Sequence, residues 1–143
     1  MLISTKGRYA LRVMIDLAEH QTDGYIPLKE VAQRQDISEK YLETIIRLLV
    51  KANILSGLRG KGGGYKLTKS PDQYTVGAIL RLTEDSLAPV SCLGPGAAVC
   101  ARAAECRTLH MLQGLDKVIN EYLDNVTIAD LMKAGAAGDN YVI

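Results

Sequence analysis

Three cysteines and one histidine form the most distinctive chemical grouping in this 143-residue sequence: Cys92, Cys100, Cys106 and His110. Soft thiolate ligands favour zinc or an iron–sulfur cluster, and an odd number of cysteines cannot all pair within one chain. The segment 88–104 is rich in glycine and has no apolar periodicity. Glycine lets a backbone approach a metal centre closely. These four residues are therefore candidate ligands of a metal centre.

The spacing of the cysteines bears on which metal they bind. Zinc sites usually contain cysteine pairs separated by two to four residues, whereas seven and five residues separate these three cysteines. The wider spacing favours an iron–sulfur cluster, although it matches no ferredoxin pattern. Structural zinc and cysteines that simply fill a core remain alternatives. A nucleophilic cysteine needs a base and an orienting acid. No such set is evident, so we predict neither enzymatic activity nor a small-molecule substrate.

Two helices must position this cysteine segment. Thr75 is suited to cap the first, which the pattern predicts over 76–85. The second is predicted over 103–125, where Cys106 and His110, four residues apart, would share one helical face. That face-sharing would bring three thiolates and one imidazole within reach of each other.

The predicted helix over 103–125 carries an apolar face too wide for one neighbouring surface in so small a protein. Its apolar residues are Leu109, Met111, Leu112, Leu115, Val118, Ile119, Tyr122 and Leu123. The simplest arrangement packs part of this face against the helix's own domain and part against a second copy of the chain. A short helix over 127–133 and a frayed tail from Gly135 would complete the chain.

The net charge of +1 conceals a gradient along the sequence. Residues 1–66 contain 11 Lys or Arg and seven Asp or Glu, a balance of +4, whereas the remainder has six and nine, a balance of −3. Between Lys40 and Lys69 there are seven basic residues and a single acid, Glu43. Such a basic region suits a phosphate backbone, although an ordinary solvated surface has a similar composition.

Helical periodicity in this basic half predicts three helices. The first is capped by Ser4 or Thr5 and runs to about His20, the second spans 28–35, and the third follows Ser38 as its N-cap. The third helix would bury Leu42, Ile45, Ile46 and Leu49 and expose Lys40, Glu43, Thr44, Arg47 and Lys51. Two helices joined by a short turn, the second with a polar and basic exposed face, are typical of a helix-turn-helix.

A β-hairpin is predicted directly after the third helix. Ile54–Ser56 and Tyr65–Leu67 are suited to two short strands, and the glycine-rich segment between them permits a tight loop. Arg59 and Lys61 would project from its tip, where basic side chains suit a narrow minor groove. This hairpin would be the wing of a winged helix.

The glycine run does not match nucleotide-binding motifs. A P-loop would need a glycine where Leu55 stands, and a dinucleotide fingerprint would need one where Tyr65 stands. No helix pattern follows the run either. We therefore exclude a nucleotide site here.

Taken together, these motifs resemble the IscR-type iron–sulfur regulators of the Rrf-two winged-helix family. The resemblance covers residues 2–133 and rests on four motifs: Ser4-Thr5-Lys6-Gly7-Arg8-Tyr9-Ala10, Tyr41-Leu42-Glu43, Arg59-Gly60-x-Gly62-Gly63-Gly64-Tyr65 and the three spaced cysteines. It implies a dimeric bacterial transcription regulator with a long dimerisation helix and a cluster held by Cys92, Cys100 and Cys106. It also implies that the third helix enters the major groove while Arg59 reaches the minor groove.

Two departures from the family pattern concern the cluster ligands. IscR-type proteins place five residues between the first two cysteines, and this chain has seven. Their ligand histidine lies three residues after the last cysteine, where this chain has Leu109, with His110 one place further on. Since residues three and four apart share one face of a helix, His110 stays among the predicted ligands.

We expect a mainly α fold, with a winged helix-turn-helix domain over 1–85 that includes a small β-hairpin wing. The cluster loop and dimerisation helix would span 86–134, followed by a tail over 135–143. A homodimer would bind approximately palindromic double-stranded DNA. The expected DNA-binding residues are Lys6, Arg8, Arg12, Ser38, Lys40, Tyr41, Glu43, Thr44, Arg47, Arg59, Gly60 and Lys61.

The expected cofactor is an iron–sulfur cluster, [2Fe–2S] rather than [4Fe–4S], whose status would control cluster-biogenesis genes. Alternatives are a related regulator that senses nitric oxide, iron or redox state, or a zinc-stabilised DNA-binding protein. No apolar stretch approaches the roughly 18–20 residues that span a bilayer, and the N-terminal residues do not form a signal peptide. We therefore expect a cytoplasmic protein without a membrane partner, which agrees with three unpaired cysteines.

Overall fold

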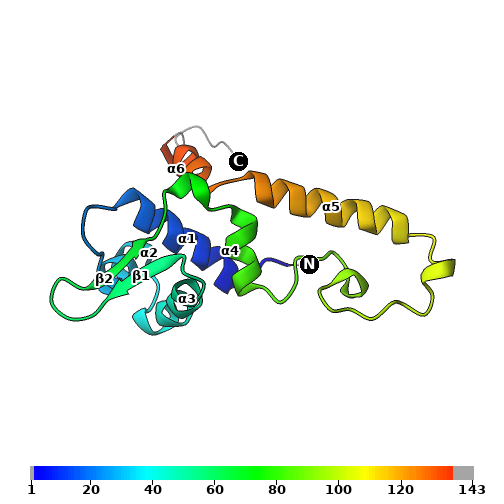
Figure 1. Ribbon diagram of the computed structural model, residues 1–143, viewed down its shortest axis with the longest axis horizontal. Helices are drawn as coiled ribbons and strands as arrows, with labels where there is room; N and C mark the ends of the chain where they lie inside the picture. Colours follow the sequence, from blue (N-terminus) through cyan, green and yellow to red (C-terminus); the bar gives the residue numbers. More distant parts are fainter. Residues whose placement is uncertain (1, 137–143) are drawn as a thin grey trace.

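The computed structural model describes residues 2–136 and confirms a mainly helical fold with one β-hairpin (Figure 1). Its regular elements are α1 (Thr5–Glu19), α2 (Leu28–Gln35), α3 (Glu39–Lys51), β1 (Leu55–Leu58), β2 (Gly64–Leu67), α4 (Val76–Thr83), α5 (Leu109–Asn125) and α6 (Ile128–Ala136), with short 3₁₀ turns at Pro71–Gln73, Ser91–Leu93 and Ala103–Glu105. We call residues 2–85 and 126–136 the head and residues 86–125 the arm. The arm projects from one side of the head (Figure 1).

The core of the head forms around α1, whose buried residues recur at the helical period. They are Gly7, Ala10, Val13, Met14, Asp16, Leu17 and Ala18. The Ser4 hydroxyl caps this helix by accepting the Gly7 N–H at 3.0 Å. Because an N-cap oxygen satisfies a backbone donor that has no partner within the helix, it fixes where α1 begins.

The predicted helix-turn-helix is confirmed in α2 and α3. The turn between them consists of Asp36, in the left-handed conformation with φ 54°, buried Ile37, and Ser38. Ser38 caps α3 by accepting the Tyr41 N–H at 3.2 Å. The buried residues of α3 are the four that its periodicity predicts: Leu42, Ile45, Ile46 and Leu49.

The predicted wing is confirmed as an antiparallel pair with Leu55 opposite Leu67 and Leu58 opposite Gly64. Its loop is closed by a hydrogen bond from Gly63 N–H to Gly60 O, 3.0 Å, and Gly60 and Gly62 have positive φ. Gly64 has φ 146°, and a Cβ there would lie 2.1 Å from the Ile26 carbonyl oxygen. Only glycine fits this position because the wing pairs there with the chain before α2, through reciprocal Ile26–Tyr65 backbone hydrogen bonds.

The chain returns to the head through α6, which packs on α1 through Ile128, Leu131 and Met132. The predicted short helix over 127–133 is therefore confirmed, although it extends to Ala136. Gly135 and Ala136 belong to this helix, and the remainder of the predicted tail lies outside the described residues.

The prediction that the long helix begins near Ala103 was wrong. Ala103–Glu105 forms only a 3₁₀ turn, Cys106 is extended at φ −77° and ψ 105°, and α5 begins at Leu109. A helix is stabilised mainly by packing an apolar face, and the side chains over 104–108 are exposed. The helix accordingly starts where its apolar residues start. In the described part of the chain no helix is long and apolar enough to cross a membrane.

Candidate DNA-binding surface and cysteine loop

The outer face of α3 presents polar and basic side chains to solvent. Lys40, Glu43, Thr44 and Arg47 are exposed, whereas Tyr41 is half-buried and meets the Tyr9 ring edge-on, with centroids 5.7 Å apart. Across residues 2–136, no ion pair is found for Lys40, Glu43 or Arg47. These charged groups therefore keep their hydrogen-bonding capacity for an external partner.

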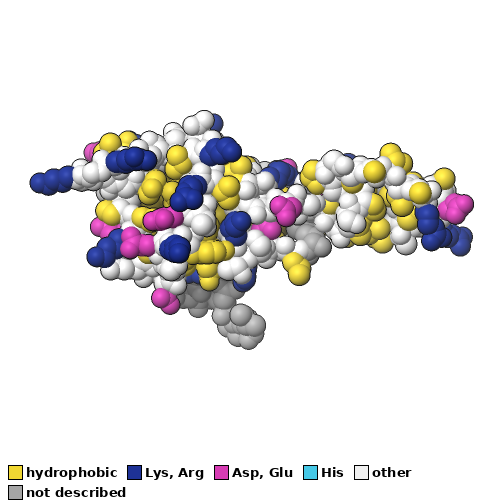
Figure 2. All heavy atoms as spheres, turned by 90° about the horizontal axis from the view of Figure 1, so that it is seen from below, with side chains coloured by type: hydrophobic (Ala, Val, Ile, Leu, Met, Phe, Trp, Pro, Cys, Tyr) yellow, Lys and Arg dark blue, Asp and Glu magenta, His cyan; other side chains and the backbone are white. Residues whose placement is uncertain are grey.

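The wing places a second exposed basic group beside α3. Arg59, Gly60 and Lys61 are exposed at its tip, and the groove between α3 and the wing has a volume of about 560 Å³. Glu43, Arg47 and Arg59 contribute to the lining of this groove. Figure 2 views the molecule from below, and Lys and Arg side chains spread over the head in that view. The predicted recognition helix and wing tip therefore border one continuous surface.

The three basic residues predicted near the start of the chain differ in their surroundings. Arg8 is exposed and Lys6 half-buried. Arg12 instead bonds within the head, because its Nε donates to Gln35 Oε1 at 3.0 Å, a second nitrogen donates to the Gln35 carbonyl, and its guanidinium lies 4.9 Å from the Tyr9 ring centroid. The partners of Arg12 in the structure are thus intramolecular.

A buried polar cluster behind the helix-turn-helix escaped the sequence analysis. Asp16 is 1% exposed. Arg34 donates two hydrogen bonds to its carboxylate, from Nη2 to Oδ1 at 2.7 Å and from Nε to Oδ2 at 3.0 Å. Gln35 Nε2 donates to the same carboxylate at 2.9 Å. Burial raises the pKa of Asp16, but the hydrogen bonds from Arg34 and Gln35 outweigh it and hold the pKa below its ordinary value. These hydrogen bonds hold α2 against α1. The one sign of the cluster in the sequence is an acidic residue, Asp16, on the otherwise apolar face of α1.

The three cysteines lie in the arm as free, exposed thiols. Over residues 2–136 the structure brings no three His, Cys, Asp or Glu side chains into a metal-binding group. Cys106 lies outside α5, so the prediction that it shares a helical face with His110 was wrong. Its Sγ lies 3.5 Å from the Thr108 hydroxyl, and hydrogen bonds from that hydroxyl and from nearby backbone N–H groups lower the pKa of the Cys106 thiol.

An apolar stripe runs along the free side of α5. Met111, Leu115, Val118 and Tyr122 recur at intervals of four, three and four residues and are 58%, 43%, 61% and 69% exposed. Leu123, which is buried, packs α5 onto the head together with half-buried Ile119. Apolar side chains show along the arm in Figure 2. The helix thus divides its apolar residues between contacts with its own chain and exposure to solvent, and the predicted contact with a second copy stays a prediction.

Comparison with known proteins gives the family. Residues 3–134 of this chain match the sequence pattern of the Rrf2 family, which is described as an iron-dependent transcriptional regulator. The chain belongs to the Rrf2 family. The fold agrees, because the structure titled "T. potens IscR" matches all of this chain and 93% of its own with a TM-score of 0.73 and 35% identity.

Two further relatives of this Rrf2 chain are named IscR and CymR. The HTH-type transcriptional regulator IscR of Aliivibrio salmonicida is 35% identical over 132 residues, 92% of this chain and 77% of that protein. CymR of B. subtilis, described as a global cysteine regulator, has a TM-score of 0.70 at 35% identity over 93% of this chain and 97% of its own. This Rrf2 protein is therefore a DNA-binding transcriptional regulator and not an enzyme.

Proposed function

We propose that this Rrf2 regulator is a homodimer that binds an iron–sulfur cluster on its cysteine loop and changes its DNA affinity or operator choice with cluster status. One observation carries the proposal: three exposed free cysteines stand on the segment that joins the head to the solvent-facing stripe of α5. The target genes that fit this role are those of cluster biogenesis. A regulator of genes acts in the cytoplasm, where thiols stay reduced.

The chemistry of the donor set fits a cluster. Cys92, Cys100 and Cys106 supply three soft thiolates, and His110, exposed in the first turn of α5, supplies a fourth donor. Mixed thiolate and imidazole ligation is known for [2Fe–2S] centres, which favours that cluster over [4Fe–4S]. The cluster would supply reversible redox chemistry and sensitivity to iron supply.

The loop needs to rearrange to gather these ligands. Its backbone hydrogen bonds are isolated turns, such as Gly94 N–H to Ser91 O at 3.1 Å and Cys106 N–H to Ala103 O at 3.3 Å. Closing the loop therefore breaks neither a sheet nor a long helix. Loops with such local bonding lie at the low end of local stability.

The head supports a division of labour in DNA binding. With α3 in the major groove, Lys40, Tyr41, Thr44 and Arg47 would meet bases or phosphates, and Glu43 can accept from cytosine N4–H. Ser38, Lys6 and Arg8 would add phosphate contacts, which position the protein without specifying sequence, whereas Arg12 would keep its bonds to Gln35 and hold α1 against α2. From the wing, Arg59 would enter the minor groove, with Gly60 and Lys61 beside the backbone.

The stripe on α5 supports a homodimer. A heptad-like spacing of apolar side chains is the pattern by which two helices pack together. Two heads on one two-fold axis would bind half-sites separated by whole helical turns, which gives an approximately palindromic operator.

The test is anaerobic purification followed by assays of iron, acid-labile sulfide and zinc. Red-brown protein with about two irons and two sulfides per chain supports [2Fe–2S]. Colourless protein with stoichiometric zinc would instead identify a zinc-stabilised regulator.

A second experiment compares the binding of Cys92→Ala and of its neighbour Ser91→Ala to an operator selected from random duplexes. Cluster loss and altered operator binding confined to Cys92→Ala support the sensing role, and unaltered binding refutes it. Cluster-containing protein is also treated with nitric oxide and with oxidants. If nitric oxide, or an oxidant alone, removes the cluster, the protein senses that reagent and not the availability of iron–sulfur clusters.

A further inference from the structure

The hydroxyl of Tyr74 closes the open end of the wing. Tyr74 follows the 3₁₀ turn Pro71–Gln73 and is 5% exposed. Its oxygen lies 3.2 Å from the carbonyl of Ile54, accepts the N–H of Lys69 at 2.8 Å and shares a 2.8 Å hydrogen bond with the Thr68 hydroxyl. Ile54 directly precedes β1, and Thr68 and Lys69 directly follow β2. One buried oxygen therefore bonds to the chain at the base of both strands.

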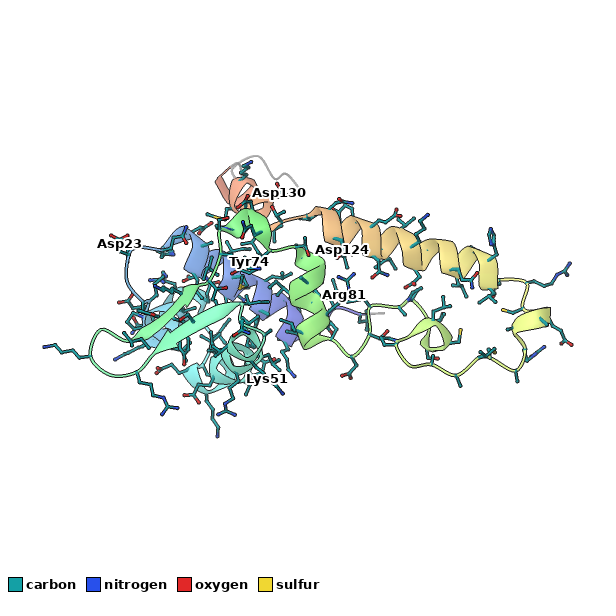
Figure 3. The ribbon with its side chains drawn as sticks, in the orientation of Figure 1. Asp23, Lys51, Tyr74, Arg81, Asp124 and Asp130 are labelled. Atoms are coloured by element: carbon teal, nitrogen blue, oxygen red, sulfur yellow. The ribbon has the colours of Figure 1, made fainter. Side chains whose placement is uncertain are left out.

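The backbone of the same residue meets the chain returning from the arm. The Tyr74 carbonyl accepts the N–H of Ile128 at 2.9 Å, and Val76 N–H donates to the Val126 carbonyl at 2.8 Å. Figure 3 labels Tyr74 between the hairpin and α4. Tyr74 thus joins the start of α6 to the base of the wing, and Val76, two residues further on, bonds to the residue that follows α5.

The wing needs such an attachment. Each strand has four residues, and an isolated two-stranded hairpin is marginally stable in water. Beyond the two strands, the described residues give the wing one bridge, between Ile26 and Tyr65, and one backbone hydrogen bond at its base, from Thr68 N–H to the Ile54 carbonyl at 3.2 Å. Loosening the base would let the tip, where Arg59 lies, move relative to α3.

We propose that Tyr74 is a positioning residue for DNA binding: its hydroxyl sets the direction of the wing so that Arg59 and the recognition helix engage the same DNA segment. This inference rests on the proposed contact between the wing and the minor groove. It assigns no DNA contact to Tyr74, which is buried.

The test variant is Tyr74→Phe, which keeps the ring in the core and removes only the hydroxyl. In the free protein, amide hydrogen exchange of residues 55–67 should become faster while α1 stays protected. On the selected operator, affinity should fall about fivefold to tenfold, because binding must then order a wing base that has lost the three contacts of the hydroxyl. Thr75→Val is the matched control, because it removes a neighbouring hydroxyl that caps α4 through the Ala78 N–H. It should lower stability without changing exchange in the wing.

A double-mutant cycle separates positioning from simple destabilisation. Tyr74→Phe should add nothing to the loss caused by Arg59→Ala, but should add fully to the loss caused by Arg47→Ala on α3. Full additivity with Arg59→Ala, or unchanged wing exchange in Tyr74→Phe, overturns the inference. If Arg59→Ala itself leaves affinity unchanged, the proposed wing contact fails and the inference fails with it.

Discussion

Replacing Val118 by glutamate should dissociate the proposed dimer while leaving the monomer folded. Val118 lies in the middle of the α5 stripe, between Leu115 and Tyr122, and is 61% exposed in the single chain. Glutamate is a good helix former, so α5 should persist. The substitution acts twice in a two-fold dimer, because each α5 contributes its own Val118.

The magnitude follows from the exposed fraction. Fully burying a valine-sized side chain contributes about 1.5–3 kcal/mol, so burying the exposed 61% contributes about 1–2 kcal/mol per copy. Two copies give about 2–4 kcal/mol, which corresponds to a roughly 30-fold to 1000-fold rise in the dissociation constant. Burying two carboxylates in the interface would add to this loss.

Sedimentation velocity over a wide concentration range measures the monomer–dimer equilibrium directly. Gln113→Glu is the matched control, because Gln113 is exposed on α5, lies about half a turn away from the stripe and receives the same charge. Circular dichroism should show equal helix content in the three proteins. An unchanged dissociation constant in Val118→Glu, or equal weakening in Gln113→Glu, would refute the assignment of this stripe to the dimer.

Three further outcomes are expected. Arg59→Ala should weaken operator binding by about 1–3 kcal/mol in fluorescence anisotropy, with little change in non-specific binding; equal losses on both DNAs would contradict a specific minor-groove contact. Asp16→Asn should destabilise the head by about 2–3 kcal/mol in urea unfolding, somewhat less than the 3–5 kcal/mol typical of a broken buried pair because the Arg34 side chain is 30% exposed. Since the folded pKa of Asp16 lies below its ordinary value, its contribution is present above about pH 4 and is lost as the pH falls further, so the wild-type advantage should shrink in acid; an advantage that stays constant down to pH 2 would be inconsistent with this ion pair. Glu84→Gln should lower the free energy of unfolding by about 0.5–1 kcal/mol and with it the melting temperature, because the Glu84 carboxylate accepts both the N–H and the hydroxyl of Ser4 at the start of α1. An unchanged melting temperature would show that this contact contributes nothing.

Local signals predicted the head well. The periodicity of Leu42, Ile45, Ile46 and Leu49 gave the buried face of α3, and Ser38 marked its first turn, because helix periods and caps depend on neighbouring residues alone. The glycines of the wing loop predicted a tight hairpin for the same reason, because a positive φ depends on the residue itself. These features require no knowledge of distant parts of the chain.

Contacts between distant residues were not predictable in this way. Nothing local relates Asp16 to Arg34, or the Tyr74 hydroxyl to the Ile54 carbonyl, because each pair meets only after the helices and strands have packed. The start of α5 was misplaced for a related reason: alanines at 103 and 104 favour a helix locally, but no packed surface there supports one. The proposed gathering of the cysteines by a cluster depends in the same way on contacts between residues that are distant in the sequence.

The arm leaves the head after α4 and re-enters it as α6, so it is held to the head where it departs and where it returns. Near the return, Arg81 Nη1 bonds to Asp124 Oδ1 at 2.6 Å, which fixes α5 to α4 (Figure 3). The 17 residues of α5 make a rod about 25 Å long. Pivoted at this bond, a tilt of roughly 8° moves the far end by about 3.4 Å, the rise of one base pair along the axis of a DNA duplex. In the proposed homodimer, a small change where the cysteine loop meets the tip of this rod would therefore alter how the two heads are oriented toward the operator.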